Sequence, residues 1–401
     1  MLAFFVSLLL SLPVLFASGY LFLLAALARK PKSAPTPLGP APSIRFDIVV
    51  PAHDEEPVIA ETIASLKAVD YPADLYRIIV VADNCADATA SKAEEAGAFV
   101  LTRTDPERKA KGYALQFAFD WLKKEGLPDV VVVVDADTVV STNILVELAK
   151  KFENGAAAVQ VAYLVRNAEA AWRTRLVALS FILMHVLRSL ARERLGVSVG
   201  LRGDGMAFSR EVIRNVPYHA FSTAEDVEHG IKLGEYGYRV EYVGNAYVES
   251  EMIAAEGPSR SQRQRWERGR AGLALEHGPK LITAAFRKRD KILLDLAMDL
   301  LIPPLSTLTL LIAAGSLVSL VTGFFVGHPL AVASPWLIAA AFVSLYVARG
   351  LQLWGAGLRG VIDLLWVPVY VVWKIGLWLK PPREPIGVGG KRARLKAFHE
   401  Q

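Results

Sequence analysis

The residues with the clearest chemistry in this chain are two carboxylates spaced two positions apart, Asp135 and Asp137. They follow five consecutive valines at 130–134, and such an apolar run is typical of a buried strand. Mg²⁺ or Mn²⁺ suits a pair of hard oxygen ligands at a turn, because substrate phosphates and water complete the coordination of the ion. The pattern therefore predicts a metal site that stabilises a diphosphate as a leaving group.

Two lysines, Lys109 and Lys111, lie with Gly112 at the start of the helix predicted before that strand. Backbone N–H groups at a helix start and two ammonium charges would face a phosphate in the same region. The alternative is an ordinary solvated helix start.

A second acidic pair, Glu225 and Asp226, follows Ala224 further along the chain. Transfer of a group to an acceptor hydroxyl needs a base that removes the proton as the new bond forms. Asp226 is the candidate base, and the like charges of Glu225 and Glu228 would raise its pKa. The alternative is that these acids compensate a helix dipole.

Three side chains at helical spacing, Gln262, Arg265 and Trp266, share one helix face. Arg265 could bridge diphosphate oxygens, and Trp266 offers an apolar platform for a ligand. The alternative is a basic amphipathic helix on anionic lipid. Both functions are compatible, since long apolar segments begin soon afterwards.

Short apolar runs alternate with segments of helical spacing between residues 45 and 163. Strands this apolar, separated by helices, indicate an α/β domain with a mostly parallel sheet covered on both faces. The expected strands are 47–50, 77–81, 98–101, 130–134 and 157–163, and the expected helices are 56–68, 88–96, 111–125 and 143–153.

Polar side chains follow four of these strands, and ligands of parallel sheets bind at the carboxyl ends of the strands. The alternative is that they only end strands and cap helices. No G-x-G-x-x-G follows a strand and no P-loop motif occurs, which argues against dinucleotide dehydrogenases and P-loop ATPases. The polar residues are His53 and Glu55, Asp83, Arg103, and the Asp135–Asp137 pair.

Two further segments carry predictions. Glycines at 200, 203 and 205 surround Arg202 and Asp204, which predicts a mobile loop that approaches a ligand closely. The stretch 172–195 is helical by spacing, but its apolar core at 176–187 is too short to span a bilayer, so we expect either an interfacial helix or a buried core helix.

The composition predicts a membrane protein. Of 401 residues, 53% are hydrophobic, and residues 300–348 contain no charged side chain. A bilayer crossing needs ~20 apolar residues, so two crossings fit there, near 303–326 and 331–348. Residues 1–28 are uncharged and predict a transmembrane anchor, since a signal peptide would have a basic start and a shorter apolar core. Arg29, Lys30 and Lys32 follow, which places the next domain in the cytoplasm.

The remaining C-terminal segments are predicted as follows. Residues 276–302 form interfacial amphipathic helices, and residues 303–379 form a membrane region of two or three helices. Within it, 360–379 include Asp363, Pro368 and Lys374. A crossing there would put the basic tail, 380–401, outside the cell, so we favour an interfacial or re-entrant segment and a cytoplasmic tail. A third crossing is the alternative.

Other classes fit the composition poorly. The single cysteine, Cys85, excludes a disulfide framework. A net charge of +5, without a basic patch interleaved with aromatics, argues against nucleic acid as a partner.

With these motifs in order, the chain resembles the membrane-integrated family 2 glycosyltransferases, which include cellulose, chitin and hyaluronan synthases and ceramide glucosyltransferase. The resemblance covers roughly residues 45–270, within a predicted glycosyltransferase domain at 45–275. Four motifs carry it: Asp83, Asp135-Ala136-Asp137, Glu225-Asp226, and Gln262-x-x-Arg265-Trp266.

The resemblance implies a GT-A fold, an inverting transfer from a UDP-sugar, a divalent ion (Mg²⁺ or Mn²⁺), and a location in the cell membrane with the catalytic domain in the cytoplasm. It also implies the roles of the matching residues. His53, Glu55 and Asp83 would surround the uridine, Lys111 and Asp135 would bind the donor, Asp137 the metal, and Asp226 would be the base. Glu225, Gln262, Arg265 and Trp266 would hold diphosphate and acceptor.

The chain departs from the cellulose synthases, which have Thr at the position of Ala224. It also has at most four hydrophobic crossings with little polar lining for a channel. We therefore expect transfer to a lipid or short glycan; a processive polysaccharide synthase is the alternative, and a homo-oligomer could supply missing helices. Two other classes stay open: a transporter subunit, although no repeat is visible, and a non-catalytic sugar-nucleotide binder.

Overall fold

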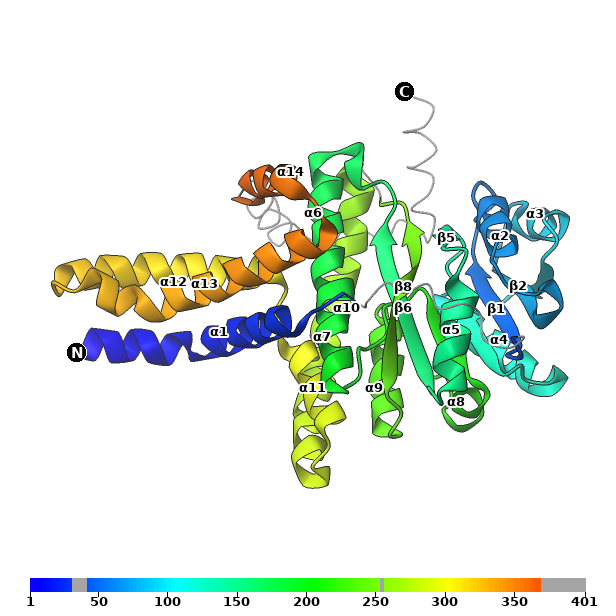
Figure 1. The fold of residues 1–401 in the computed structure, drawn as a ribbon, viewed down its shortest axis with the longest axis horizontal. Helices are drawn as coiled ribbons and strands as arrows, with labels where there is room; N and C mark the ends of the chain where they lie inside the picture. The colour runs from blue at the N-terminus through cyan, green and yellow to red at the C-terminus, as the bar shows by residue number, and fades with distance from the viewer. Residues whose placement is uncertain (31–41, 253–255, 369–401) are drawn as a thin grey trace.

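The computed structural model describes residues 1–30, 42–252 and 256–368, with only the backbone described for 256–267. An α/β domain is joined to a group of long apolar helices (Figure 1).

One eight-stranded sheet forms the centre of the α/β domain, in the order β3-β2-β1-β4-β7-β6-β8-β5. Strands β1, β2, β3 and β4 are parallel, as are β6 and β8, whereas β7 and β5 run antiparallel to their neighbours. The α/β class with a mostly parallel sheet is thus confirmed. The strands are β1 Phe46–Ala52, β2 Tyr76–Asp83, β3 Phe99–Arg103, β4 Val130–Val133, β5 Thr138–Val140, β6 Ala158–Val165, β7 Met206–Ser209 and β8 Val240–Ser250.

Alternate residues of the central strands are buried on opposite faces of this sheet, because successive side chains of a strand point to opposite sides. On β1, Val49 packs into the core that contains α4 and α8, whereas Ile48 and Val50 pack into the core that contains α2, α3 and α5. Helices therefore cover both faces. They are α2 Ile59–Lys67, α3 Thr89–Glu95, α4 Lys111–Glu125, α5 Ile144–Glu153, α8 Arg210–Asn215 and, at the candidate site, α9 Glu225–Glu235.

Three long apolar helices lie side by side, away from the sheet: α1 Leu2–Leu27, α12 Leu305–Phe325 and α13 Pro329–Trp354 (Figure 1). Phe22 of α1 stacks on Phe342 of α13 at 5.0 Å, and the hydroxyl of Ser7 lies 3.0 Å from that of Ser319 of α12. By length and hydropathy each could cross a membrane. Helices α10 Glu256–Lys288 and α11 Lys291–Leu301 lie at the end of this group nearest the sheet and run crosswise to it (Figure 1).

The segment 172–195 is a continuous helical stretch: α6 Trp172–Phe181, a π-helical turn at Ile182–Leu187, and α7 Arg188–Leu195. By length and hydropathy it too qualifies as a possible span, so its apolar part was wrongly expected to be too short. Its packing on β6 and α13, and the burial of Arg188 and Arg192, agree with the expected core helix.

The chain beyond α13 is described as far as residue 368 and contains α14 Gly357–Asp363 and a 3₁₀ turn at Leu364–Trp366. Arg175 of α6 donates two hydrogen bonds to Asp363, at 2.7 and 2.9 Å. This contact holds α14 against α6. The expectations for 369–379 and for the tail 380–401 lie outside the described residues.

Gly112, at the start of α4, allows a close backbone approach that positions Lys111. A Cβ at this position would collide with the carbonyl oxygen of Ala220. We expect Gly112→Ala to destabilise the protein by about 1–3 kcal/mol, as overpacking does. The measurement is the thermal unfolding temperature in detergent. Gly272→Ala is the control, because nothing lies within 4 Å of its added Cβ; an equal effect of both substitutions would contradict the prediction.

Candidate active site

The loops after β1, β2 and β3 meet at the carboxyl edge of the sheet and are joined by side-chain hydrogen bonds. His53 donates from Nδ1 to the carbonyl oxygen of Asp83 at 2.7 Å, and the amide of Glu55 donates to Oγ1 of Thr89 at 2.7 Å. The expected nucleotide-binding residues His53, Glu55 and Asp83 are therefore brought to one edge.

Asp83 is almost fully buried and forms an ion pair with Arg103 at the end of β3, with 2.6 Å between Oδ1 and Nη1. Arg103 also pairs with Asp105 at 2.9 Å. A buried carboxylate needs such a partner, because desolvation of an unpaired charge is costly. Arg103 thereby fixes the orientation of Asp83.

Two non-glycine residues in this region adopt the left-handed backbone conformation, Asp54 and Asn84, each with φ of 52°. Aspartate and asparagine tolerate it because their side chains bond to nearby backbone groups. Asp54 accepts from the amide of Ala86 at 2.7 Å, and Asn84 accepts from the amide of Asp105 at 2.7 Å. The two turns thus direct the polar residues of the loops to the sheet edge.

Lys111 connects the end of β4 to the start of α9. Its Nζ lies 2.5 Å from Asp135 and 4.0 Å from Glu225, and it donates to the carbonyl oxygen of Gly203. Burial would lower the pKa of Lys111, but the charges of Asp135 and Glu225 outweigh burial and raise it. A permanent positive charge therefore lies between the two acidic motifs. Lys109 is exposed and precedes α4, whereas Lys111 pairs with the site carboxylates.

Asp204 is a site residue that the sequence motifs missed. It is fully buried, and its carboxylate accepts hydrogen bonds from the amide of Asp135 at 3.1 Å and from the hydroxyl of Thr138 at 2.7 Å. Burial and the charge of Asp135 raise the pKa of Asp204 to about 7. Gln160 accepts from the backbone amide of Arg202 and donates to the carbonyl oxygen of Asp204, which holds this loop against β6. The expected mobility of the loop stays a prediction. An aspartate enclosed by glycines was the available signal.

Asp226 lies beside the same loop, because a Cβ added to Gly203 would come within 3.6 Å of its Oδ2. Burial raises the pKa of Asp226. The expected rise in the pKa of Asp226 is thus present, and its main cause is burial rather than the like charge of Glu225 and Glu228. Burial likewise raises the pKa of Glu225 to about 7, although Lys111 opposes it.

The backbone of α10 carries Gln262, Arg265 and Trp266 on one helix, but their side chains lie outside the described residues. The same helix passes close to the acidic motif: a Cβ on Gly269 would lie 3.2 Å from the Cβ of Ala224. The helix that carries the Gln262-x-x-Arg265-Trp266 motif thus packs next to the residues before Glu225 and Asp226.

A model of the family described as "Glycosyltransferase like family 2" matches residues 42–269. The chain belongs to this family. Curated relatives include "Probable glycosyltransferase YdaM" of Bacillus subtilis (strain 168), 28% identical over 63% of this chain and 60% of the relative. Another is "N-acetylglucosaminyltransferase" of Mesorhizobium japonicum, 28% identical over 59% of this chain and 58% of the relative. "Beta-monoglucosyldiacylglycerol synthase" of Synechocystis is 25% identical over 71% and 61%. The chain thus spans 58% to 61% of the length of these relatives.

A solved structure shares the fold: the mannosyltransferase PcManGT from Pyrobaculum calidifontis, in complex with GDP-Man and Mn²⁺, superposes with a TM-score of 0.55 and 18% identity. The similarity covers 87% of this chain and 98% of PcManGT. The expected GT-A fold is thereby confirmed.

The carboxylates after β4 fit a divalent ion in this family 2 chain by their donor chemistry. Asp135 and Asp137 are both partly exposed in the turn between β4 and β5, and both offer hard oxygen ligands. Among the described residues, three side chains lie close enough together to share one ion, and they do not include Asp135 or Asp137. They are Asp54, Cys85 and Asp87. The thiol of Cys85 suits Mg²⁺ or Mn²⁺ poorly. An ion at Asp137 would draw its remaining ligands from phosphates and water.

We expect Arg103→Gln to destabilise the protein by about 3 kcal/mol, because it leaves Asp83 buried without its partner. The measurement is thermal unfolding of the purified protein, with and without UDP. Arg108→Gln is the control, since Arg108 is exposed on the same loop. Equal unfolding temperatures for the two variants would show that the Asp83–Arg103 pair does not support this edge.

Proposed function

We propose that this chain is a membrane-bound inverting glycosyltransferase that moves a sugar from a UDP-sugar to an acceptor hydroxyl of a lipid or short glycan. The observation that carries the proposal is the position of Lys111. It joins the carboxylate expected to bind donor, Asp135, to the acidic pair that supplies the expected base, Glu225 and Asp226. One lysine side chain therefore contacts both the carboxylate assigned to the donor and the acidic pair assigned to the acceptor.

In this proposal the donor lies along the carboxyl edge of the sheet. His53, Glu55 and Asp83 surround the uridine, and Lys111 and Asp135 lie at the diphosphate. Gln262, Arg265 and Trp266 are assigned to the diphosphate and acceptor because α10 passes beside Ala224.

Asp226 removes the proton from the acceptor hydroxyl as that oxygen attacks the sugar carbon, and the UDP leaves from the opposite side. Direct displacement inverts the configuration and needs no enzyme nucleophile. The raised pKa of Asp226 makes it a stronger base than an ordinary aspartate. A divalent ion bound at Asp137 would neutralise charge on the departing diphosphate. Lys111 adds a fixed positive charge beside Asp135.

Two observations favour a lipid acceptor over a secreted polymer. Relatives of the chain include beta-monoglucosyldiacylglycerol synthases. The apolar helices α1, α12 and α13 pack closely on one another, and Trp336 donates a hydrogen bond to Ser7 within this group. A secreted polymer would instead need a polar channel through the helices. The apolar anchors would hold the sheet domain at the inner face of the cell membrane. Processive polymer synthesis is the second candidate, because N-acetylglucosaminyltransferases are also among the relatives.

We expect Asp226→Asn to lower turnover by about 10²–10⁴-fold, the usual contribution of a general base. The measurement is UDP release from the purified full chain with a panel of UDP-sugars and lipid acceptors, followed by mass spectrometry of the products. Glu235→Gln is the control, because Glu235 is exposed at the far end of α9. Unchanged turnover in Asp226→Asn would refute the base assignment, and products bearing long sugar chains would favour the polymer synthase.

Removal of divalent ions with EDTA should abolish UDP release, and Mn²⁺ or Mg²⁺ should restore it. Asp137→Asn should raise the metal concentration for half-maximal activity at least about tenfold, since even outer-sphere partners of a metal have effects of this size. Asp87→Asn tests the alternative acidic group and should leave the metal requirement unchanged. The opposite result would move the ion to Asp54, Cys85 and Asp87.

A further inference from the structure

Asp299 of α11 lies among four arginines from three other segments of the chain. Its carboxylate is 3.3 Å from Arg188 and 3.3 Å from Arg192, both on α7. It is 3.6 Å from Arg202, in the loop before β7, and 3.4 Å from Arg270 on α10. We call these four arginines the arginine cluster. One carboxylate is thus shared by four guanidinium groups.

The second carboxylate paired with the cluster is Asp295, which accepts from Arg192 at 2.6 Å and from the hydroxyl of Tyr20 at 2.6 Å. Within the part of the chain whose side chains are described, four positive charges are therefore paired with two negative charges. The arginine side chains are between 0% and 16% exposed. Burial of unbalanced charge is costly, so the cluster is suited to an anion.

Two donors of the cluster point to the same conclusion. Nη2 of Arg192 and Nε of Arg202 are buried and have no hydrogen-bond partner among the described residues. Arg192 is 0% exposed and Arg202 is 8% exposed. A buried donor without a partner pays the full cost of its desolvation, and a phosphate oxygen would remove that cost.

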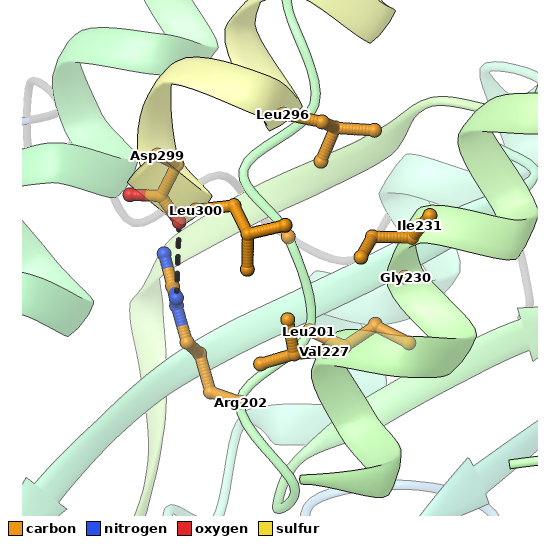
Figure 2. Close-up of a pocket in the computed structure, with 9 residues that line it drawn as sticks. Leu201, Arg202, Val227, Gly230, Ile231, Leu296, Asp299 and Leu300 are labelled. Carbon is orange, nitrogen blue, oxygen red and sulfur yellow. Dashed lines mark ion pairs between the residues drawn. The ribbon is translucent and has the colours of Figure 1, made fainter. Parts of the chain in front are cut away.

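A small pocket opens beside Arg202 and Asp299, and the rest of its lining is apolar (Figure 2). Figure 2 shows leucine and isoleucine side chains from α9, α11 and the loop on either side of the gap, with the Arg202–Asp299 ion pair at one end. The pocket has room for about one water molecule, so it could admit a phosphate oxygen beside Arg202 but not a hydrocarbon chain. The apolar residues are Leu201, Val227, Ile231, Leu296 and Leu300.

The position of the cluster favours a lipid over a soluble anion. Tyr20 of α1 bonds to Asp295, and Tyr346 of α13 accepts from Arg188 at 3.0 Å, so apolar helices reach the cluster directly. On its other side, Arg202 is next to Gly203, which lies beside Asp226. The cluster thus lies between the apolar helices and the candidate site.

We propose that the arginine cluster binds the phosphate group of a membrane lipid, with the hydrocarbon of that lipid lying along the apolar helices α1 and α13 that reach the cluster. This is a binding site separate from the carboxylates assigned to the sugar donor. Its test uses no sugar donor, so its outcome is independent of the proposed transfer.

The experiment uses the full chain, purified in a non-ionic detergent and depleted of lipid. Phosphatidic acid is added in one arm, diacylglycerol with the same acyl chains in a second, and inorganic phosphate in a third. Native mass spectrometry measures the bound lipid, and thermal unfolding measures stabilisation, which follows binding to the native state. We expect phosphatidic acid to bind and to raise the unfolding temperature, and diacylglycerol to do neither. Equal binding of the two lipids would overturn the phosphate site, and equal stabilisation by inorganic phosphate would overturn its lipid part.

Variants locate the site. Arg202→Gln should weaken phosphatidic acid binding about tenfold or more, the effect of losing one hydrogen bond between charged groups. Arg270→Gln should weaken it as well, and because Arg270 is more exposed it serves if Arg202→Gln does not fold. The control is Arg210→Gln, since Arg210 pairs with Asp129 at the start of α8. Unchanged affinity in both cluster variants, or an equal loss in the control, would overturn the assignment.

Discussion

The candidate site depends on the positive charge of Lys111 in a region where acids from three segments converge. Asp135 follows β4, Asp204 precedes β7, and Glu225 begins α9. Without a cation these carboxylates would repel one another in a partly buried region, where like charges interact strongly. Lys111 contacts the first and the last of them and also the backbone at Gly203. Its charge allows three separate segments to bring carboxylates to one place.

Close backbone packing makes this arrangement possible. Gly112 lies against the carbonyl of Ala220, and this contact sets the start of α4 and therefore the position of Lys111. Gly205 has φ of +65°, and an added Cβ there would collide with Val161 of β6. A side chain at either position would push the loop or the helix outward. Glycine is thus required at these two positions, so that the charged side chains around them can come close together.

The loop that holds Arg202 and Asp204 connects two charge clusters. Asp204 faces the carboxyl edge of the sheet, where it bonds to Asp135 and Thr138, and Arg202 faces Asp299 on α11. Movement of α11 relative to the sheet would therefore act on the loop beside Asp226. In the proposed function this links the apolar helices to the site of transfer, and a lipid in the arginine cluster would stabilise the link.

The sequence by itself determined the central strands, the helix at 111–125, the apolar segments and the order of the acidic motifs. These are local properties, because hydrophobic periodicity records how one element is buried. The sequence did not reveal strands β5, β7 and β8, because they are short or half-polar. They are stabilised as strands by pairing with their neighbours in the sheet. Only the tertiary structure decided that Lys111 pairs with Asp135, that Asp204 supports Asp135, and that Arg202 turns toward Asp299. These contacts join residues far apart in the chain, and they depend on the close packing and the shared burial of charge that only the folded chain creates.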